Sequence, residues 1–393
     1  MDLSQGYTER DADEMAQHYM WRDHVGEMYE LMLAQSVPES PLAFEWIADN
    51  IAVMSDFPQQ KGSDNESEDE STKSNEEVQS KDDEEEVKPR VFSINPYRGG
   101  SPIWSHTVDS EANQLRVLDH RAKFYVAAIC GNGNVLVFEY GSKRPPLKLL
   151  LHTKNGFGLS WNRATGVLAS GAEDGQVAVW KIDFEQFALA SSQAIKVGYQ
   201  VNDVVWQDAH TLVAAGEDGL IRVYDETLRL KVEFKTCHTG SVNTLAINPW
   251  APSMLATGSS DHTIGLWDLR DVESNARPLY VFSGHEGDIN CLEFSPTVDG
   301  VLASGAADHR VILWDIRKLG AAQDQEDAEE AAPEIIFIHG GHIMVVSDLA
   351  WHPTRPWVLG SASEECKVQV WTPNELTTTS ENVREIVMPK EYI

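Results

Sequence analysis

The sequence has few cysteines, no long apolar run and few basic residues. Its four cysteines, Cys130, Cys237, Cys291 and Cys366, are far apart and form no CxxC pair, which favours reduced thiols in an intracellular compartment. No apolar run reaches the roughly 18 residues that span a bilayer. Residues 1–35 contain no secretory core either. We therefore expect a soluble protein with no membrane partner.

Basic residues are half as numerous as acidic ones. The chain has 31 Lys and Arg against 62 Asp and Glu, a formal net charge of −31. A protein of this charge repels phosphate backbones and attracts basic partners, so direct nucleic-acid binding is disfavoured. The plain alternative is that the acidity serves solubility alone.

The residue patterns of common catalytic sites are also missing. The sequence has no Gly-rich phosphate loop, no nucleophile elbow and no metal-spaced set of His and Cys. His339 and His342 flank a Gly-Gly pair without carboxylate or Cys companions, a pattern more typical of structural histidines than of a metal site. We therefore expect no enzyme, no cofactor and no metal.

A repeated unit dominates what is present. Residues 284–315 begin with Gly-His, alternate apolar and polar residues between Pro, Gly and Asp turns, and end in Trp-Asp, which predicts short antiparallel strands. Similar units end at Phe138, Trp180, Tyr224, Trp267, Trp314 and Trp371, spaced by 42 to 57 residues. The WD repeat of a β-propeller blade has a period of roughly 40 to 45 residues. Counting one weak blade at about 51–107, we predict an all-β, seven-bladed WD40 β-propeller.

Polar residues recur at fixed places in these units. In the WD repeat, a His, a Ser or Thr, an Asp and a Trp form a buried hydrogen-bonded relay. The residues at these places are His238, Asp261, Trp267, His285, Ser304, Asp308 and Trp314. Because a scaffold device recurs in every blade whereas an active site occurs once, we interpret them as structural.

The N-terminal part predicts a helix followed by a closing strand. Apolar residues at spacings of three and four indicate an amphipathic helix over about 11–35 within an N-terminal segment of 1–41. Leu42–Trp46 alternate as a strand does, and we expect them to complete the last blade of a propeller spanning 42–373. Residues 374–393 form a polar tail.

Two stretches are strongly acidic. Residues 63–86 carry twelve acidic residues, two lysines and no aromatic residue, which predicts a disordered loop. Their Ser-x-x-acid spacings weakly resemble acidophilic kinase sites. Residues 318–333 form a second acidic insertion, before the last blade. Both stretches favour a basic partner.

Particular stretches resemble the retinoblastoma-associated family of WD40 histone chaperones, which includes the small subunits of chromatin assembly factor one and type B histone acetyltransferase. They are Pro333–Trp371, Gly156–Trp161, Leu255–Arg270, and the W-x(7)-Y-x-L pattern of Trp21–Leu31 with Trp46. The resemblance covers nearly the whole chain apart from the first blade and the 63–86 loop. It implies a non-enzymatic histone-binding scaffold of chromatin assembly, acetyltransferase, deacetylase, remodelling or Polycomb complexes, in the nucleus with a cytoplasmic pool.

The resemblance further implies two sites. In the first, a histone-four helix lies in a groove between the N-terminal helix and the acidic insertion. The groove residues carried over are Met28, Leu31, Met32, Glu326, Asp327, Glu329, Glu330, Ile335 and Ile336. The second is a face around the central channel that holds the histone-three tail or similar basic peptides. Its residues are Glu111, Asn113, Phe157, Asn243 and Glu364, with Phe157 standing where the family has Tyr.

Two other functions fit parts of the sequence. Trp267–Arg270 and Trp314–Arg317 match the W-D-x-R pattern of substrate-receptor adaptors in cullin-type ubiquitin ligases. That pattern is also frequent in ordinary blades. An acidic WD40 protein with an N-terminal helix also fits a ribosome-assembly chaperone that shields a basic protein.

Overall fold

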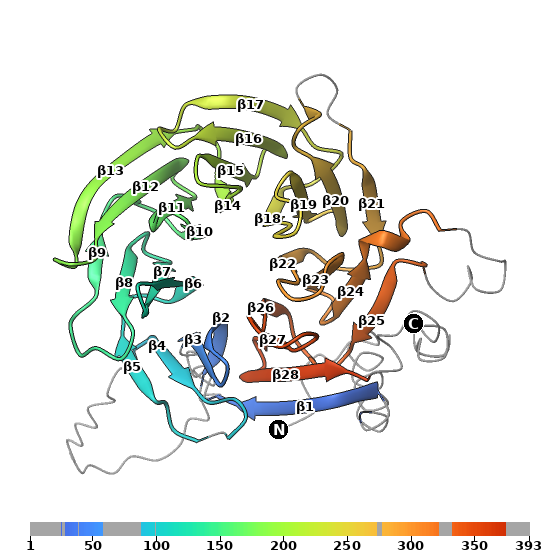
Figure 1. Ribbon diagram of the computed structural model, residues 1–393, viewed down its shortest axis with the longest axis horizontal. Helices are drawn as coiled ribbons and strands as arrows, with labels where there is room; N and C mark the ends of the chain where they lie inside the picture. The colour runs from blue at the N-terminus through green and yellow to red at the C-terminus, as the bar shows by residue number, and fades with distance from the viewer. Residues whose placement is uncertain are drawn as a thin grey trace, which may run out of the picture.

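Seven antiparallel four-stranded sheets form a closed ring. The computed structural model describes residues 25, 28–37, 39–57, 88–98, 100–272, 277–321 and 332–374. The sheets are the blades, and they surround a central opening (Figure 1). The first strand of blade 1 contacts the first strands of blades 2 and 7, so the ring is complete. The seven-bladed propeller predicted from the repeat is confirmed.

Each blade runs from an inner strand to an outer one. Blades 1 to 3 are built from β2 (Ser40–Ala48), β3 (Ile51–Phe57), β4 (Arg90–Ile94), β5 (Trp104–Thr107), β6 (Ala112–His120), β7 (Lys123–Cys130), β8 (Val135–Glu139), β9 (Leu147–Leu149), β10 (Gly156–Asn162), β11 (Val167–Ala172), β12 (Gln176–Asp183) and β13 (Ala188–Lys196). Blades 4 and 5 are built from β14 (Val201–Trp206), β15 (Thr211–Gly216), β16 (Leu220–Asp225), β17 (Leu230–Lys235), β18 (Val242–Ile247), β19 (Met254–Ser259), β20 (Thr263–Asp268) and β21 (Tyr280–Ser283). Blades 6 and 7 are built from β22 (Ile289–Phe294), β23 (Val301–Ala306), β24 (Val311–Asp315), β25 (Ile335–His339), β26 (Val346–Trp351), β27 (Leu359–Ser363), β28 (Lys367–Pro373) and β1 (Tyr29–Ser36). A 3₁₀ turn, η1 (Ile316–Lys318), follows β24.

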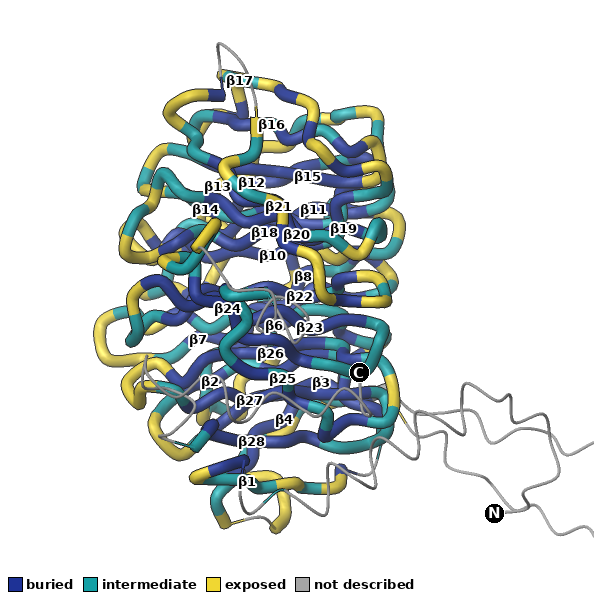
Figure 2. Tube along the Cα trace, turned by 90° about the vertical axis from the view of Figure 1, so that its right-hand side faces the viewer, coloured by how far each residue is buried: buried dark blue, intermediate teal, exposed yellow. Residues whose placement is uncertain are grey.

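The core lies between the blades. Apolar residues of the two middle strands of each blade, buried on both faces, pack against those of the next blade, and exposed residues gather at turns and outer strands (Figure 2). The largest side chains that are fully buried include Trp180, Trp267, Trp314 and Trp371, one from the third strand of each of four blades. These are the aromatic residues that end the repeats, so the sequence period marks the core.

The ring is closed by β1, not by Leu42–Trp46 as we expected. β1 pairs antiparallel with β28, with Met32 opposite Trp371 and Leu33 opposite Val370. Leu42–Trp46 belong to β2, the inner strand of blade 1. That position suits them because Phe44 is fully buried and Trp46 nearly so, which an outer strand does not provide. The prediction that Leu42–Trp46 close the ring was therefore wrong, because the strand before them, β1, does so.

The predicted helix does not continue to residue 35. Val25 and Met28 have helical backbone, whereas Tyr29–Ser36 are the strand β1. Backbone pairing with β28 outweighs the helical spacing of the apolar residues, because it covers an edge of blade 7 that would otherwise be open. Residues 11–24 and the 63–86 loop lie outside the described residues.

Candidate functional site

The relay residues are brought together in each repeat that carries them. In blade 6, Asp308 Oδ2 lies 2.8 Å from His285 Nδ1, and His285 Nε2 lies 2.6 Å from Ser304 Oγ. Trp314 Nε1 donates to the same hydroxyl at 2.8 Å. Equivalent sets are Asp261, His238, Thr257 and Trp267 in blade 5, Asp174, His152, Ser170 and Trp180 in blade 3, and Glu365, His342, Ser361 and Trp371 in blade 7.

In blade 5, burial and hydrogen bonds shift the pKa values of both ionisable residues of the relay. Burial lowers the pKa of His238, outweighing the attraction of Asp261. Burial opposes ionisation of Asp261, but hydrogen bonds from Thr263 and Thr239 and the nearby His238 bring its pKa down to about 2. The His238 imidazole ties Asp261, in the turn between the second and third strands, to the Thr257 hydroxyl on the second strand, which also accepts the Trp267 indole of the third. The relay therefore stabilises the four blades that carry it, and its histidines are buried.

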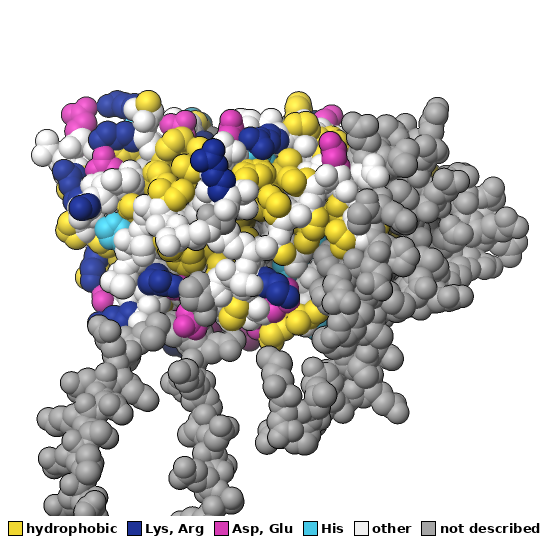
Figure 3. All heavy atoms as spheres, turned by 90° about the horizontal axis from the view of Figure 1, so that it is seen from below, with side chains coloured by type: hydrophobic (Ala, Val, Ile, Leu, Met, Phe, Trp, Pro, Cys, Tyr) yellow, Lys and Arg dark blue, Asp and Glu magenta, His cyan; other side chains and the backbone are white. Residues whose placement is uncertain are grey.

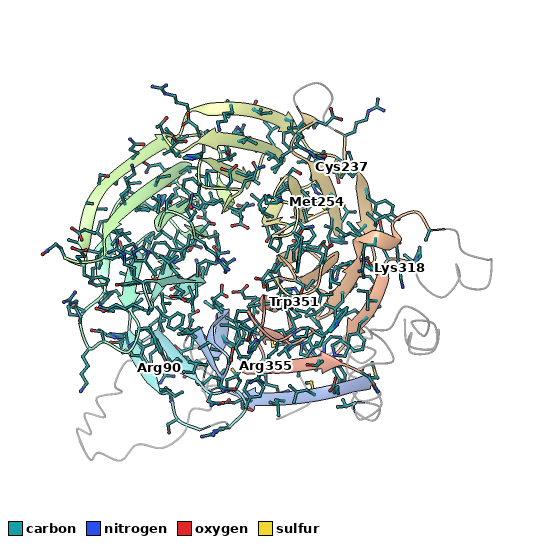
Figure 4. The ribbon with its side chains drawn as sticks, in the orientation of Figure 1. Arg90, Cys237, Met254, Lys318, Trp351 and Arg355 are labelled. Carbon is teal, nitrogen blue, oxygen red and sulfur yellow. The ribbon has the colours of Figure 1, made fainter. Side chains whose placement is uncertain are left out.

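A central channel runs along the axis of the ring. Its cavity has a volume of about 1550 Å³ and is lined by the inner strands of all seven blades. Figure 4 shows Trp351 at the wall of this opening and Lys318 at the outer rim of the molecule. We call the end where the inner strands begin the upper rim and the opposite end the lower rim.

The channel wall carries charged residues that we did not predict. Carboxylates come from Glu45, Asp203, Glu293 and Asp348, on four different blades. Arg116 of blade 2 faces them, and its Nη1 lies 4.0 Å from Asp348 Oδ2. The available sequence signal was a charged residue inside an otherwise apolar inner strand, present in five of the seven blades and missing from β10 and β18.

Burial raises the pKa of all four of these carboxyl groups, including that of Glu45. Burial and the neighbouring Glu45 raise the pKa of Glu293 to about 8. Burial raises that of Asp348 to about 7 and that of Asp203 to about 6, although Arg116 opposes both shifts. The channel therefore holds protons near neutral pH.

The same carboxylates join neighbouring blades. Asp203 Oδ2 accepts the main-chain N–H of Leu245 at 2.8 Å, linking blade 4 to blade 5. Asp348 Oδ2 accepts that of Phe44 at 3.0 Å, linking blade 7 to blade 1. Each carboxylate satisfies a buried donor across a seam, so its first role is structural.

The upper rim is a ring of irregular positions. Every inner strand has a register shift near its start, and the extra residues are Leu42, Asn113, Phe157, Asn202, Asn243, Asn290 and Ser347. Asn113 Nδ2 donates to Gly156 O at 2.9 Å and Asn243 Nδ2 to Ile289 O at 3.2 Å, each in the next blade. An aromatic ring cannot make this bond, so Phe157 interrupts the pattern.

Four of the five residues implied for the channel face line the channel. Asn113, Phe157, Asn243 and Glu364 line the channel cavity. Phe157 is 36% exposed. Glu111 lies outside the cavity lining and accepts a hydrogen bond from Ser110 Oγ at 2.7 Å. The face combines one exposed apolar ring with amides already bonded to main-chain carbonyls.

The N-terminal segment lies against the strand that follows the acidic insertion. Tyr29 Oη is 2.7 Å from His339 Nδ1, and the Tyr29 ring meets Phe337 edge-on at 5.2 Å between centroids. Met28 is buried in the same cluster, and Met32 and Ile336 pack on its edge. This cluster joins Val25, Met28, Tyr29 and Met32 to β25.

Other implied groove residues fall in different places. Leu31 belongs to β1, and it packs on the cluster of Phe44 and Trp46, away from the side that Met32 covers. It is thus not part of a helical wall, because successive strand residues point to opposite faces. Ile335 is half-buried on β25. The acidic wall of Glu326, Asp327, Glu329 and Glu330 lies outside the described residues.

Glu334 adds a carboxylate to this region that the groove prediction omitted. It is only 2% exposed, and its Oε1 accepts the hydroxyl of Tyr280 at 2.9 Å. Oε2 has no hydrogen-bond partner among the described residues. Glu334 was predicted for neither site, although it directly precedes Ile335 and Ile336 of the predicted groove.

The described ranges contain neither a candidate metal site nor a helix suited to span a membrane. They contain no group of three or more His, Cys, Asp and Glu arranged to hold a metal ion. They also contain no helix with the length and apolarity needed to cross a membrane.

The comparison with protein families identifies the repeat. Residues 193–225, 230–268, 276–315 and 334–372 match the family model described as WD domain, G-beta repeat. Each match begins in or just before the outer strand of one blade and ends with the third strand of the next. Propellers of such repeats are typically non-catalytic scaffolds suited to protein–protein interaction. The chain therefore carries WD40 repeats, in blades 3 to 7 of a seven-bladed propeller.

Proposed function

We propose that this protein is a non-enzymatic histone-binding subunit, which shields histones three and four and presents them to a chromatin assembly or histone-modifying complex in the nucleus. The observation that carries the proposal is the packing of Met28 and Tyr29 against β25. It places the N-terminal segment next to the strand that the acidic insertion enters. The family resemblance assigns the groove for the histone-four helix to this junction.

The physical chemistry of the junction favours a basic amphipathic helix. Met32 and Ile336 remain half-buried at the edge of the apolar cluster and offer surface for burial. Glu334 keeps one buried oxygen without a partner among the described residues, and an Arg or Lys would satisfy it. Docking a helix into an apolar groove flanked by carboxylates uses both features. The upper rim, with Phe157 and Glu364, is the proposed site for the histone-three tail.

The arginines of the W-D-x-R pattern do not favour the ligase-adaptor alternative. Arg270 pairs with Asp268 at 2.6 Å, and Arg317 pairs with Asp315 at 2.8 Å. Both guanidinium groups are thus engaged within their own turns. Co-purification with a ligase linker protein would favour the ligase-adaptor function over histone binding. Nucleolar enrichment together with a ribosomal protein would favour the ribosome-assembly chaperone.

A peptide titration tests the proposal. A labelled peptide of histone-four helix one is titrated with the full-length protein by fluorescence anisotropy, at low and moderate salt. Reversing Asp327 and Glu329 to Lys should weaken binding by about tenfold or more, because each reversal replaces an attraction with a repulsion. Reversing Glu217 and Glu226, exposed acids of blade 4 across the ring from β1, is the matched control (Figure 1). Equal binding by both variants would contradict the proposal.

A further inference from the structure

One sector of the ring has the opposite charge to the rest of the chain. Residues 88–154 carry ten Lys and Arg against four Asp and Glu, whereas the whole chain has 31 against 62. They form the outer half of blade 1 and all of blade 2. Lys and Arg side chains stand among apolar ones on the described part of the side that includes β1 and β5 (Figure 3).

Five of these cations gather at the lower end of the two blades. The first and third strands of a blade run in the same direction, so the turns that follow them lie at the same end of the ring. Five exposed basic residues lie in these turns at the lower rim or directly after them. We call them the basic patch: Arg98, Arg121, Lys123, Lys143 and Arg144.

Nearby carboxylates do not balance the patch. Glu139 is shared by Lys123 at 2.5 Å and Arg144 at 4.0 Å, and Glu185 lies 3.3 Å from Arg121. Two other exposed acids lie at this end of the two blades: Asp119 near the end of β6, and Asp49 in the turn after β2 of blade 1, which leaves three carboxylates of these blades against five cations. Within the described part of the chain, Arg98 and Lys143 have no carboxylate within 4.0 Å. The patch therefore keeps an excess of positive charge.

The turn that carries Lys143 and Arg144 is held in place. Ser142 O accepts the indole N–H of Trp104 at 3.3 Å, and Ser142 Oγ accepts the main-chain N–H of Arg144 at 3.1 Å. The Arg144 guanidinium lies over the Phe187 ring of blade 3, 5.4 Å from its centroid. The two cations thus sit on an ordered turn anchored to blades 1 and 3, and little order has to be gained on binding.

We propose that the basic patch binds an acidic extended segment of a partner protein. A segment of about eight residues spans roughly 27 Å, which confines it to neighbouring blades. A nucleic acid is disfavoured because its phosphates would continue beyond the patch over a molecule that is otherwise strongly acidic. The basic patch lies away from the proposed histone sites and has the opposite charge. One protein can therefore hold a basic and an acidic partner together.

A binding assay with charge reversals tests the proposal. A fluorescein-labelled ten-residue poly-Glu peptide is titrated with the full-length protein at low salt. Reversing Lys143 and Arg144 to Glu should weaken binding by about tenfold, and added salt should weaken the wild type towards the variant. The control reverses Arg229 and Lys231 to Glu, two exposed cations at the corresponding turn of blade 4.

Each outcome decides the proposal. Loss with the blade 2 variant alone supports it, whereas equal loss with both variants would mean that only total charge matters and would overturn it. Tighter binding of a ten-nucleotide oligo(dT) that also depends on Lys143 and Arg144 would make this a nucleic-acid surface instead. If reversal lowers the melting temperature, the neutral Gln pair is used, with a loss of about threefold expected.

Discussion

Trp351 makes two hydrogen bonds to Glu293 of the preceding blade. Its main-chain N–H donates to Glu293 Oε2 at 2.7 Å, and its indole N–H donates to the Glu293 carbonyl at 3.0 Å. The pair fastens blade 6 to blade 7 inside the channel, and blade 7 is the blade that the N-terminal strand β1 completes. One acidic side chain thus serves both ring closure and the charge of the channel.

The raised pKa of Glu293 makes the stability of the ring depend on pH. Since the pKa in the folded state, about 8, exceeds its ordinary value of 4.5, the associated stability is complete below about pH 4.5 and is lost as the pH rises towards 8. Glu293→Gln keeps an acceptor for Trp351 and removes the ionisation. We expect the loss of unfolding free energy between pH 6 and pH 9 to be smaller in the variant, by about 1–2 kcal/mol after allowance for channel water. Urea unfolding followed by Trp fluorescence measures it. Glu286→Gln, at an exposed loop of the same blade, should leave the pH dependence unchanged.

Arg116 offsets the charge of the channel carboxylates. Asp348, Glu45 and Asp203 are among the acids that act on it. Arg116→Gln leaves them without this cation, and we expect a loss of about 2–4 kcal/mol in unfolding free energy at pH 8. The loss should shrink at pH 5.5, below the pKa values of about 7 for Asp348 and about 8 for Glu293, because these two carboxyl groups are then protonated. Adding Asp348→Asn should restore part of the stability; a penalty that stays equal at both pH values would contradict this account.

The Ser304 hydroxyl in blade 6 is hydrogen-bonded to both the His285 ring and the Trp314 indole. Ser304→Ala leaves His285 Nε2 and Trp314 Nε1 without their partner, so we expect a loss of about 2–4 kcal/mol. Ser304→Thr should retain most of the stability, because Thr257 fills the same role in blade 5. Thermal and urea unfolding of the two variants gives the comparison. Similar losses in both would point to steric effects and away from hydrogen bonding.

Two substitutions of Tyr29 distinguish the contribution of packing from that of hydrogen bonding at the N-terminal junction. Tyr29→Phe removes the bond to His339 Nδ1 and should cost about 1 kcal/mol, whereas Tyr29→Ala also removes the ring from Phe337 and Trp371 and should cost about 3–4 kcal/mol. Urea unfolding measures both. If the junction forms the histone groove, Tyr29→Ala should also weaken the histone-four peptide, while Tyr29→Phe should bind it almost as the wild type does.

The sequence predicts the parts of this fold that repeat. The terminal aromatic residues and the turn Asp recur at a near-constant spacing, which gives six of the seven blades, and the resemblance to the WD repeat gives the relay. β1 could not be found in this way, because Val25, Met28 and Met32 satisfy helical spacing as well, and only pairing with β28 decides. The channel acids were missed for a related reason. Glu293 looks like a solvent-facing strand residue until the ring brings its neighbours together.

Pairing the first described strand with the last one sets an order of events during synthesis. Tyr29 lies opposite Pro373, so β1 leaves the ribosome long before β28 exists. Until then its free backbone edge and its Leu and Met side chains have no place to dock. The capture of β1 by β28 therefore has to wait until residues 367–373 have been made, and the edge of β1 stays open to mispairing until then.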